Sequence, residues 1–278
     1  MAQKLKVPST SRLVLEAAMS LYTSPLQQRY IAAIDFSETS GLFYDLKRQY
    51  SSIVDIICLR KESIRQMLQE KFSQSPQQQV VILGAGLDPL SLYLLENYAN
   101  DISHIIEIDN GYIEEKQKIY TDILPETVPI HFSRCDITDT DLLWHKLREN
   151  GYKEALPTTI IFEGVFHYIR NEAFIQLMKL FRTTNHRNTV MMDYFLSDQE
   201  VPDGYLPAQQ RVLELIETAL GLSLNIHSRA VISSLLEYLD ADQVKTVALH
   251  EVEKKLTGSN QLLHAPGEGL LEMVHFNI

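Results

Sequence analysis

Cysteine is scarce in this sequence, and its scarcity excludes two kinds of fold. Cys58 and Cys135 are the only two cysteines among 278 residues. They make neither a disulfide framework nor the paired spacing of a zinc site. An apolar core must therefore hold the chain together, and 45% of the residues are hydrophobic, enough for a large one.

Long apolar runs and an excess of basic residues are also lacking. The N-terminal stretch MAQKLKVPSTSRLVLEAAMS has no sustained apolar core like that of a signal peptide, and no run approaches the ~18 residues of a membrane span. We therefore expect a cytoplasmic protein without a membrane partner. The net charge of -11 disfavours a general nucleic-acid binder, which carries a basic surface.

The first quarter of the chain has a helical pattern. From about residue 9 to 73 apolar residues recur at three- and four-residue spacings, and the run SIVDIICLRKESIRQMLQEKF has the stripe of an amphipathic helix. The polar segment SQSPQQQ ends this pattern. The sequence thus predicts an N-terminal helical layer, or lid, over residues 1–75.

Strands and helices alternate after this layer. Short apolar runs typical of buried parallel strands alternate with amphipathic helices; the runs are VVILGAG, SHIIEID, PIHFSRCD, TTIIFEG and NTVMMDYF. Such alternation predicts an α/β fold, with a mostly parallel, doubly wound sheet of about seven strands and helices on both faces. VKTVALHEV and LLEMVHFNI are predicted to be two final strands, as an antiparallel pair.

The alternation stops after the fifth strand. We expect a core over residues 76–278, with a lid insertion at about 196–230 that covers the carboxyl end of the sheet together with the N-terminal layer. Both segments hold aromatic residues, some of which are expected to reach a pocket there: Tyr22, Tyr30, Phe43, Tyr44 and Tyr205.

Ligands of an open α/β sheet bind beyond the carboxyl ends of its strands, and polar or glycine residues follow four of them. Gly84-Ala85-Gly86 ends the first strand, where glycines let the backbone approach a ligand. Asp109 ends the second and suits two ribose hydroxyls. Asp136 ends the third and suits an adenine amino group, although it could also cap a turn. Glu163-Gly164 ends the fourth. Together they indicate an adenosine ligand.

The turn after the first strand discriminates between adenosine ligands. A dinucleotide fingerprint has a third glycine where this chain has Pro89. A pyrophosphate also needs a helix N-terminus free of negative charge, but Asp88 is placed there as the expected N-cap, with Pro89 in the first turn. Both features favour S-adenosylmethionine, which has no phosphate, over a nicotinamide cofactor.

VVILGAGLDPLSLYLL, HIIEID and IIFEGVFHYI, together with the helical layer, resemble the leucine carboxyl methyltransferase family over roughly residues 10 to 200. That family implies a Rossmann-like class I methyltransferase fold and S-adenosylmethionine as cofactor, with S-adenosylhomocysteine as product. It often has an acid just before the proline of its second helix, where this chain has Ser24. The resemblance implies a cofactor site made of Arg12, Arg60, Gly84, Ala85, Gly86, Asp109, Asp136, Ile137, Glu163 and Gly164.

Each of these residues has an implied role. Arg60 pairs with the methionyl carboxylate, although from position alone it could be a solvated helix charge, and Arg12 is a second basic residue. The glycines line the methionine part, and Glu163 contacts its amino group. Asp109 holds the ribose, and Asp136 the adenine, with Ile137 beside the ring.

Two residues are candidates for catalysis. His167, four residues after Glu163, could be a general base near its ordinary pKa of about 6.5 or a lining residue of the pocket. Tyr168 could orient a substrate or cover the core. For Asp193, after the fifth strand, a salt bridge is expected rather than a metal, and no metal is expected elsewhere.

The sequence thus predicts an S-adenosylmethionine-dependent O-methyltransferase acting on a small-molecule acceptor. A carboxylate on a small metabolite or polyketide-like acid is preferred, because an ionised carboxylate needs no base. Methylation of a phenol or alcohol with His167 as base stays open, as do a nicotinamide-dependent oxidoreductase, a non-catalytic cofactor-binding protein, and a homodimer.

Overall fold

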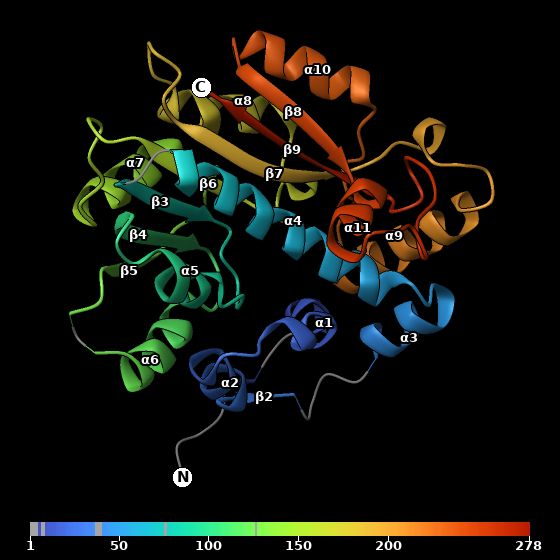
Figure 1. The fold of residues 1–278 in the computed structure, drawn as a ribbon, viewed down its shortest axis with the longest axis horizontal. Helices are drawn as coiled ribbons and strands as arrows, with labels where there is room; N and C mark the ends of the chain where they lie inside the picture. Colours follow the sequence, from blue (N-terminus) through green and yellow to red (C-terminus); the bar gives the residue numbers. More distant parts are fainter. Residues whose placement is uncertain (1–4, 7–8, 37–40, 75–76, 126) are drawn as a thin grey trace.

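A sheet of seven strands forms the centre of the computed structural model, which describes residues 5–6, 9–36, 41–74, 77–125 and 127–278. The strand order is β5-β4-β3-β6-β7-β9-β8, and only β9 runs antiparallel to its neighbours (Figure 1). The strands are β3 Gln78–Leu83, β4 Ile102–Asp109, β5 Ile130–Arg134, β6 Thr158–Phe162, β7 Thr189–Phe195, β8 Asp242–Ala248 and β9 Leu271–Asn277. The predicted Rossmann-like sheet, with its antiparallel final pair, is confirmed.

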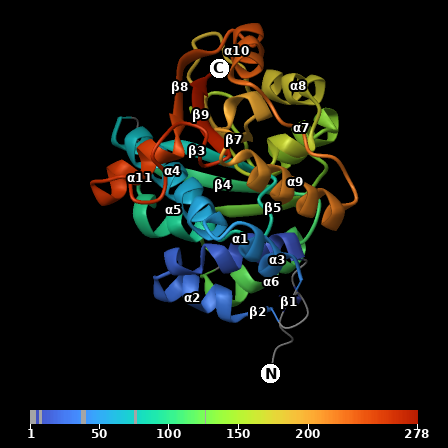
Figure 2. The same ribbon diagram turned by 90° about the vertical axis from the view of Figure 1, so that its right-hand side faces the viewer.

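Helices cover both faces of this sheet. Every residue of β3, β6 and β7 is buried, as their nearly continuous apolar sequences predicted. Figure 2 shows α4, α5 and α11 on one face and α7, α8 and α10 on the other. The connecting helices are α5 Leu90–Tyr98, α6 Ile113–Ile123, α7 Thr140–Glu149, α8 Asn171–Phe181, α10 Arg229–Tyr238 and α11 Leu249–Thr257.

The N-terminal segment is helical, as expected. It contains α1 Ser9–Ala17, α2 Pro25–Ala32, α3 Leu42–Gln49 and α4 Ile53–Gln74, with a short parallel pair of β1 Leu5–Lys6 and β2 Ile34–Asp35. Ser24 accepts a hydrogen bond from the backbone N–H of Gln27 at 3.1 Å, which explains a serine before Pro25. Even α4, with 22 residues, carries too many charges to cross a membrane, and no other described helix qualifies.

The segment after β7 turns back over the N-terminal helices. A 3₁₀ turn over Asp198–Glu200 precedes α9, Leu206–Leu220, which ends at Gly221 with a left-handed φ of 66°. α9 packs against α1 and α3 beyond the carboxyl ends of the strands. Arg229 bonds both Glu200 and Glu272, which fixes the return of the chain into α10.

One element near the C-terminus differs from the prediction. VKTVALHEV was expected to be a single strand, but β8 stops at Ala248 and α11 begins at Leu249. Glu251 accepts a hydrogen bond from the backbone N–H of Ala248 at 3.0 Å and so caps the new helix. Glu251 thus indicates the start of α11, but the apolar residues before it fit a strand as well and led to the wrong prediction.

A buried ion pair supports the turn after β3. Lys116 of α6 lies 2.5 Å from Glu107 of β4, and both side chains are fully buried. The same ammonium donates to the carbonyl of Asp88 at 2.6 Å and lies 3.5 Å from that of Ala85. Burial raises the pKa of Glu107, and Lys116 opposes that rise. The pair therefore fixes the backbone of the turn from beneath.

We predict that Lys116→Met lowers the free energy of unfolding at pH 8 by about 3–5 kcal/mol, because it leaves Glu107 buried and unpaired. Folded Glu107 would then keep a proton that the unfolded chain releases, so the stability of the variant falls as pH rises from 5 to 8. Urea unfolding across this range measures the slope.

The double variant Lys116→Met/Glu107→Gln serves as the pH control, since it lacks the titrating group. Lys118→Met, at an exposed position of the same helix, controls for loss of a lysine. If Lys116→Met is no less stable than Lys118→Met, the pair does not support the turn.

Candidate functional site

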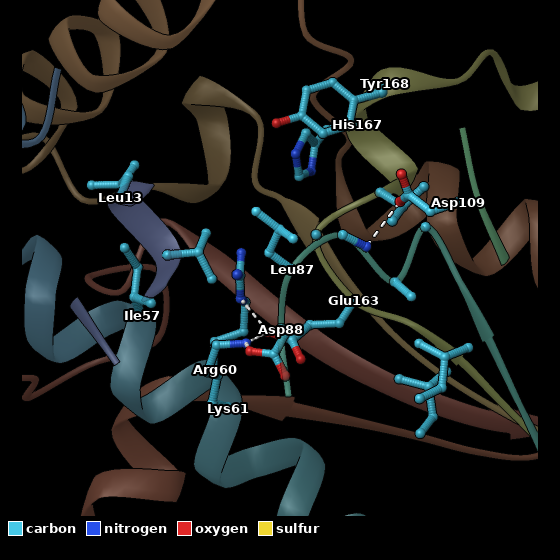
Figure 3. A pocket seen from close by; sticks show the side chains of 18 of the residues that line it. Leu13, Ile57, Arg60, Lys61, Leu87, Asp88, Asp109, Glu163, His167 and Tyr168 are labelled. Atoms are coloured by element: carbon cyan, nitrogen blue, oxygen red, sulfur yellow. Dashed lines mark hydrogen bonds and ion pairs between the residues drawn. The ribbon is translucent and has the colours of Figure 1, made fainter. Parts of the chain in front are cut away.

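A cavity of about 460 Å³ lies at the carboxyl ends of the strands (Figure 3). It brings together eleven of the twelve predicted site residues: Arg60, Gly84, Ala85, Gly86, Asp109, Asp136, Ile137, Glu163, Gly164, His167 and Tyr168. The twelfth, Arg12, belongs to α1, but its side chain lies outside the described part of the structure. Residues far apart in sequence thus meet in one place, as the sheet topology requires.

The glycine turn is held open toward the cavity by Asp109. One carboxylate oxygen accepts from the N–H of Gly86 at 2.8 Å, and the other accepts from that of Gly111 at 2.6 Å. Gly84 and Gly86 have left-handed φ values of 68° and 48°. A Cβ at Gly84 would collide with Val165, whereas one at Gly86 would meet no atom within 4 Å. Gly86 therefore presents bare backbone to a ligand.

Asp88 does not cap α5, contrary to the prediction. Pro89 is the N-cap residue, and no side chain caps the helix. Asp88 Oδ2 instead accepts from the hydroxyl of Tyr22 at 2.8 Å and lies 2.5 Å from Lys61 Nζ. The buried ammonium of Lys61 requires an anionic partner, and Asp88 pairs with it instead of capping α5.

Five charged side chains form what we call the charge cluster: Arg60, Lys61, Asp88, Glu163 and Asp193. Lys61 Nζ lies 3.0 Å from Glu163 Oε1 as well as 2.5 Å from Asp88. Arg60 Nε donates to the same Glu163 oxygen at 3.1 Å, and its Nη1 lies 3.7 Å from Asp193 Oδ2. The cluster joins α4 to the ends of β3, β6 and β7.

The cluster keeps Arg60, Lys61 and Asp88 ionised despite their burial. Burial alone would lower the pKa of Arg60, but Asp193 and Glu163 outweigh it and raise that pKa. Burial would also lower the pKa of Lys61, but Asp88 and Glu163 outweigh burial and raise that pKa. Burial would raise the pKa of Asp88, but Lys61 holds it below its ordinary value. Two permanent cations thus face the cavity.

Asp193 forms the expected salt bridge with Arg60. Its Oδ1 also accepts from the N–H of Gly164 at 2.5 Å, while the buried Oδ2 accepts no hydrogen bond from any described residue. Among the described residues no three histidines, cysteines or carboxylates come close enough to hold a metal ion.

Asp136 both caps a turn and lines the cavity. Its Oδ1 accepts from the N–H and the hydroxyl of Thr138 at 2.9 and 2.8 Å. The sequence had suggested this turn cap as an alternative to adenine binding. The neighbouring Ile137 is buried and lines the cavity with it, so a polar and an apolar group lie side by side there.

His167 is a neutral lining residue. It is 4% exposed and packs against the rings of Tyr168 and Phe195. Burial, with smaller contributions from Arg60 and His227, lowers its pKa to about 3. Its Nδ1 has no hydrogen-bond partner in the part of the chain that the structure describes. Figure 3 shows the His167 and Tyr168 rings on the same side of the cavity, opposite the charge cluster.

Ten aliphatic residues of the lining form what we call the apolar wall. It is built by α1, the first turns of α4, α9 and the start of β9 with the residue before it. Its members are Leu13, Val14, Leu15, Ile53, Ile56, Ile57, Val212, Ile216, Leu270 and Leu271.

The expectation that aromatic residues of these segments reach the pocket is wrong. Tyr22 and Tyr30 are buried behind the cavity, where they donate to Asp88 and to the carbonyl of Leu87. Phe43, Tyr44 and Tyr205 are likewise absent from the lining. Tyr22 and Tyr30 lie beneath the turn and not in the cavity because their hydroxyls donate hydrogen bonds to residues of the turn.

The polar part of the cavity fits S-adenosylmethionine. Both oxygens of Asp109 keep a lone pair for ribose hydroxyls, and Gly86 has open space beside it. Arg60 uses only Nε in a hydrogen bond with described residues, which leaves Nη donors for a carboxylate. Asp88 keeps negative charge near the turn, which suits a ligand without phosphate.

Comparison with known proteins agrees with this geometry. The model of the leucine carboxyl methyltransferase family matches residues 10–182. No curated protein matches the chain.

Several solved structures are similar. A candidate methyltransferase from Thermobifida fusca is 13% identical, over 99% of this chain and 96% of that one, with a TM-score of 0.70. A DUF574 family protein from Streptomyces avermitilis is 10% identical over 97% of each chain, with a TM-score of 0.64. A geranyl diphosphate C-methyltransferase from Streptomyces coelicolor is 10% identical over 98% of each, with a TM-score of 0.51. At these identities the likeness shows the shared fold.

We predict that the His167 ring stays neutral from pH 8.5 to 5.5, because burial and Arg60 disfavour its charged form. Nitrogen-15 NMR of labelled imidazole rings measures this, with His167→Asn to assign the signal. Since the unfolded chain gains a proton near pH 6.5 and the folded ring does not, His167 lowers the stability of the protein as pH falls from about 6.5 toward 3. A His167 signal with a midpoint above 5.5 would refute the prediction.

Proposed function

The chain belongs to the leucine carboxyl methyltransferase family, and from this premise we propose that it methylates a carboxylate on a small-molecule acceptor. It is an S-adenosylmethionine-dependent methyltransferase with the Rossmann-like class I fold. The chemical nature of the acceptor is the part that we propose. It rests on the protonation state of the groups that line the cavity.

The residues of the polar part bind and orient the cofactor. S-adenosylmethionine, when bound, supplies a methyl group already activated by its sulfonium. We assign Asp109 to the ribose hydroxyls and Asp136 to the adenine, with Ile137 beside the ring. Arg60 holds the methionyl carboxylate, and Glu163 receives the amino group. These residues mainly fix position, which is the larger task in an in-line displacement.

The burial of His167, which is only 4% exposed, is the observation that supports a carboxylate acceptor. His167 is the one histidine among the described lining residues, and its pKa of about 3 makes it a poor base for a hydroxyl or phenol. A carboxylate is already ionised at neutral pH and needs no base. Its oxygen forms a bond to the methyl carbon, the carbon–sulfur bond breaks, and no proton moves. Ester formation is therefore the reaction that this site favours.

His167 then serves as a hydrogen-bond donor and not as a base. A neutral imidazole carries one N–H, and the His167 ring lines the cavity, while its Nδ1 has no hydrogen-bond partner among the described residues. Donation to one oxygen of the acceptor carboxylate would leave the other free to attack. Figure 3 places this ring across the cavity from Arg60, so the acceptor and the cofactor carboxylate need not share a partner.

We predict that Asp109→Ala weakens binding of S-adenosylhomocysteine by about 2 kcal/mol or more, because hydrogen bonds to an ionised group contribute roughly 1.5–3 kcal/mol each. Isothermal titration calorimetry measures the change. Asp122→Ala, at an exposed position of α6, is the matched control and should bind as the native chain does. Native affinity in a folded Asp109→Ala variant would remove Asp109 from the ribose site.

We predict that His167→Asn changes turnover less than about tenfold and that the native rate has no titrating limb near neutrality. The reason is that a donor amide can replace a donor imidazole, whereas loss of a general base costs ~10²-fold or more. The rate–pH profile and the chemistry of the product are measured together. A product that resists mild alkaline hydrolysis, as an ether does, would show that the acceptor group is a hydroxyl.

A further inference from the structure

The apolar wall faces the space that the cofactor residues leave. Among the described residues, α1, α9 and the start of β9 contribute only aliphatic side chains to the cavity. Leu15, Ile56 and Val212 are each 1% exposed. The charged residues of the lining come instead from the charge cluster and the strand ends, at the polar side. The lining therefore has an aliphatic side, built by the apolar wall, and a side with charged groups, which come from α4 and the strand ends.

We propose that the acceptor is an aliphatic monocarboxylic acid, with its hydrocarbon body against the apolar wall and no second charged group. The carboxylate part rests on the function proposed above, while the aliphatic body rests on the wall alone. The class covers straight and branched alkanoic acids.

Burial favours such a body and opposes a polar one. Each methylene moved from water to the wall should improve binding about fourfold, until the space is filled. A second carboxylate or an ammonium group would lose its hydration there. Lys61 is paired with Asp88 and Glu163, and Arg60 is assigned to the carboxylate of the cofactor, so neither cation compensates that loss.

Helix α9 limits the length of the body. Val212 and Ile216 are four residues apart, so both project from one face of α9, and both line the cavity. A larger side chain at Ile216 reduces the space for the acceptor without touching the strand ends that hold the cofactor. Chain-length preference is thus separable from cofactor affinity.

The test uses butanoate, hexanoate, octanoate and decanoate, with the matching alkanols in parallel. Binding to the protein saturated with S-adenosylhomocysteine is measured by calorimetry, and methyl transfer by product analysis. We expect kcat/KM to rise about three- to fourfold per methylene up to a limit. Adipate and 6-aminohexanoate each correspond to hexanoate with one added charge. Their kcat/KM should be about 100-fold or more lower than that of hexanoate.

Variants of α9 connect the preference to the wall. Ile216→Trp should lower kcat/KM for octanoate about tenfold while butanoate changes less than about threefold, because only the longer body meets the indole. Ile216→Ala should move the optimum to a longer acid. Ala219→Trp, exposed on the same helix, is the matched control. Affinity for S-adenosylhomocysteine and the melting temperature show that each variant is folded.

The outcomes separate the two proposals. Chain-length selectivity among alkanols, with no ester formed, would refute the carboxylate and keep the aliphatic body. Esters of adipate formed as fast as those of hexanoate, or a chain-length profile unmoved by Ile216→Trp and Ile216→Ala, would refute the aliphatic body and keep the carboxylate. Failure of every acid and alkanol to bind would refute this inference.

Discussion

The ammonium of Lys61 is the contact on which the site depends. It lies between Asp88, after β3, and Glu163, after β6, and it comes from α4 of the N-terminal layer. Neither carboxylate would be stable in this buried position without a cation, and the lysine would not be charged without them. One contact therefore fixes two strand ends and the helical layer together, and Arg60, one residue along, is positioned as a consequence.

Arg60 of the charge cluster also acts on His167, where it adds to the larger effect of burial. Arg60 lies close enough to His167 to disfavour a second positive charge, and the rings and aliphatic groups around the histidine remove its water. In the proposed function, the arginine that holds the cofactor carboxylate therefore also disfavours protonation of the histidine. Both effects support our proposal of an acceptor that is already ionised when it binds.

Sequence alone predicted the strands, the fold class and the residues at the strand ends, because each depends on local pattern. Asp109 and Asp136 could be placed since parallel strands end at one edge of the sheet. Lys61 was missed, and Asp88 was predicted to be a helix N-cap, because their partners are 27 or more residues away along the chain. A charge on an amphipathic helix also resembles a solvated one. α11 was missed because Ala248 and Leu249 continue a strand pattern until Glu251 caps a helix.

The segment that the family model matches, residues 10–182, does not cover the whole lining of the cavity. The residues assigned to the cofactor come from strand ends and helices of the N-terminal layer, all within that segment, and six of the ten members of the apolar wall lie within it as well. Val212, Ile216, Leu270 and Leu271 of the apolar wall lie beyond that segment. Family membership therefore constrains the methyl donor closely and the acceptor weakly. The class of the acceptor is therefore inferred from the residues that line the cavity. There, α9 and the start of β9 bring aliphatic side chains close to the helices of the N-terminal layer.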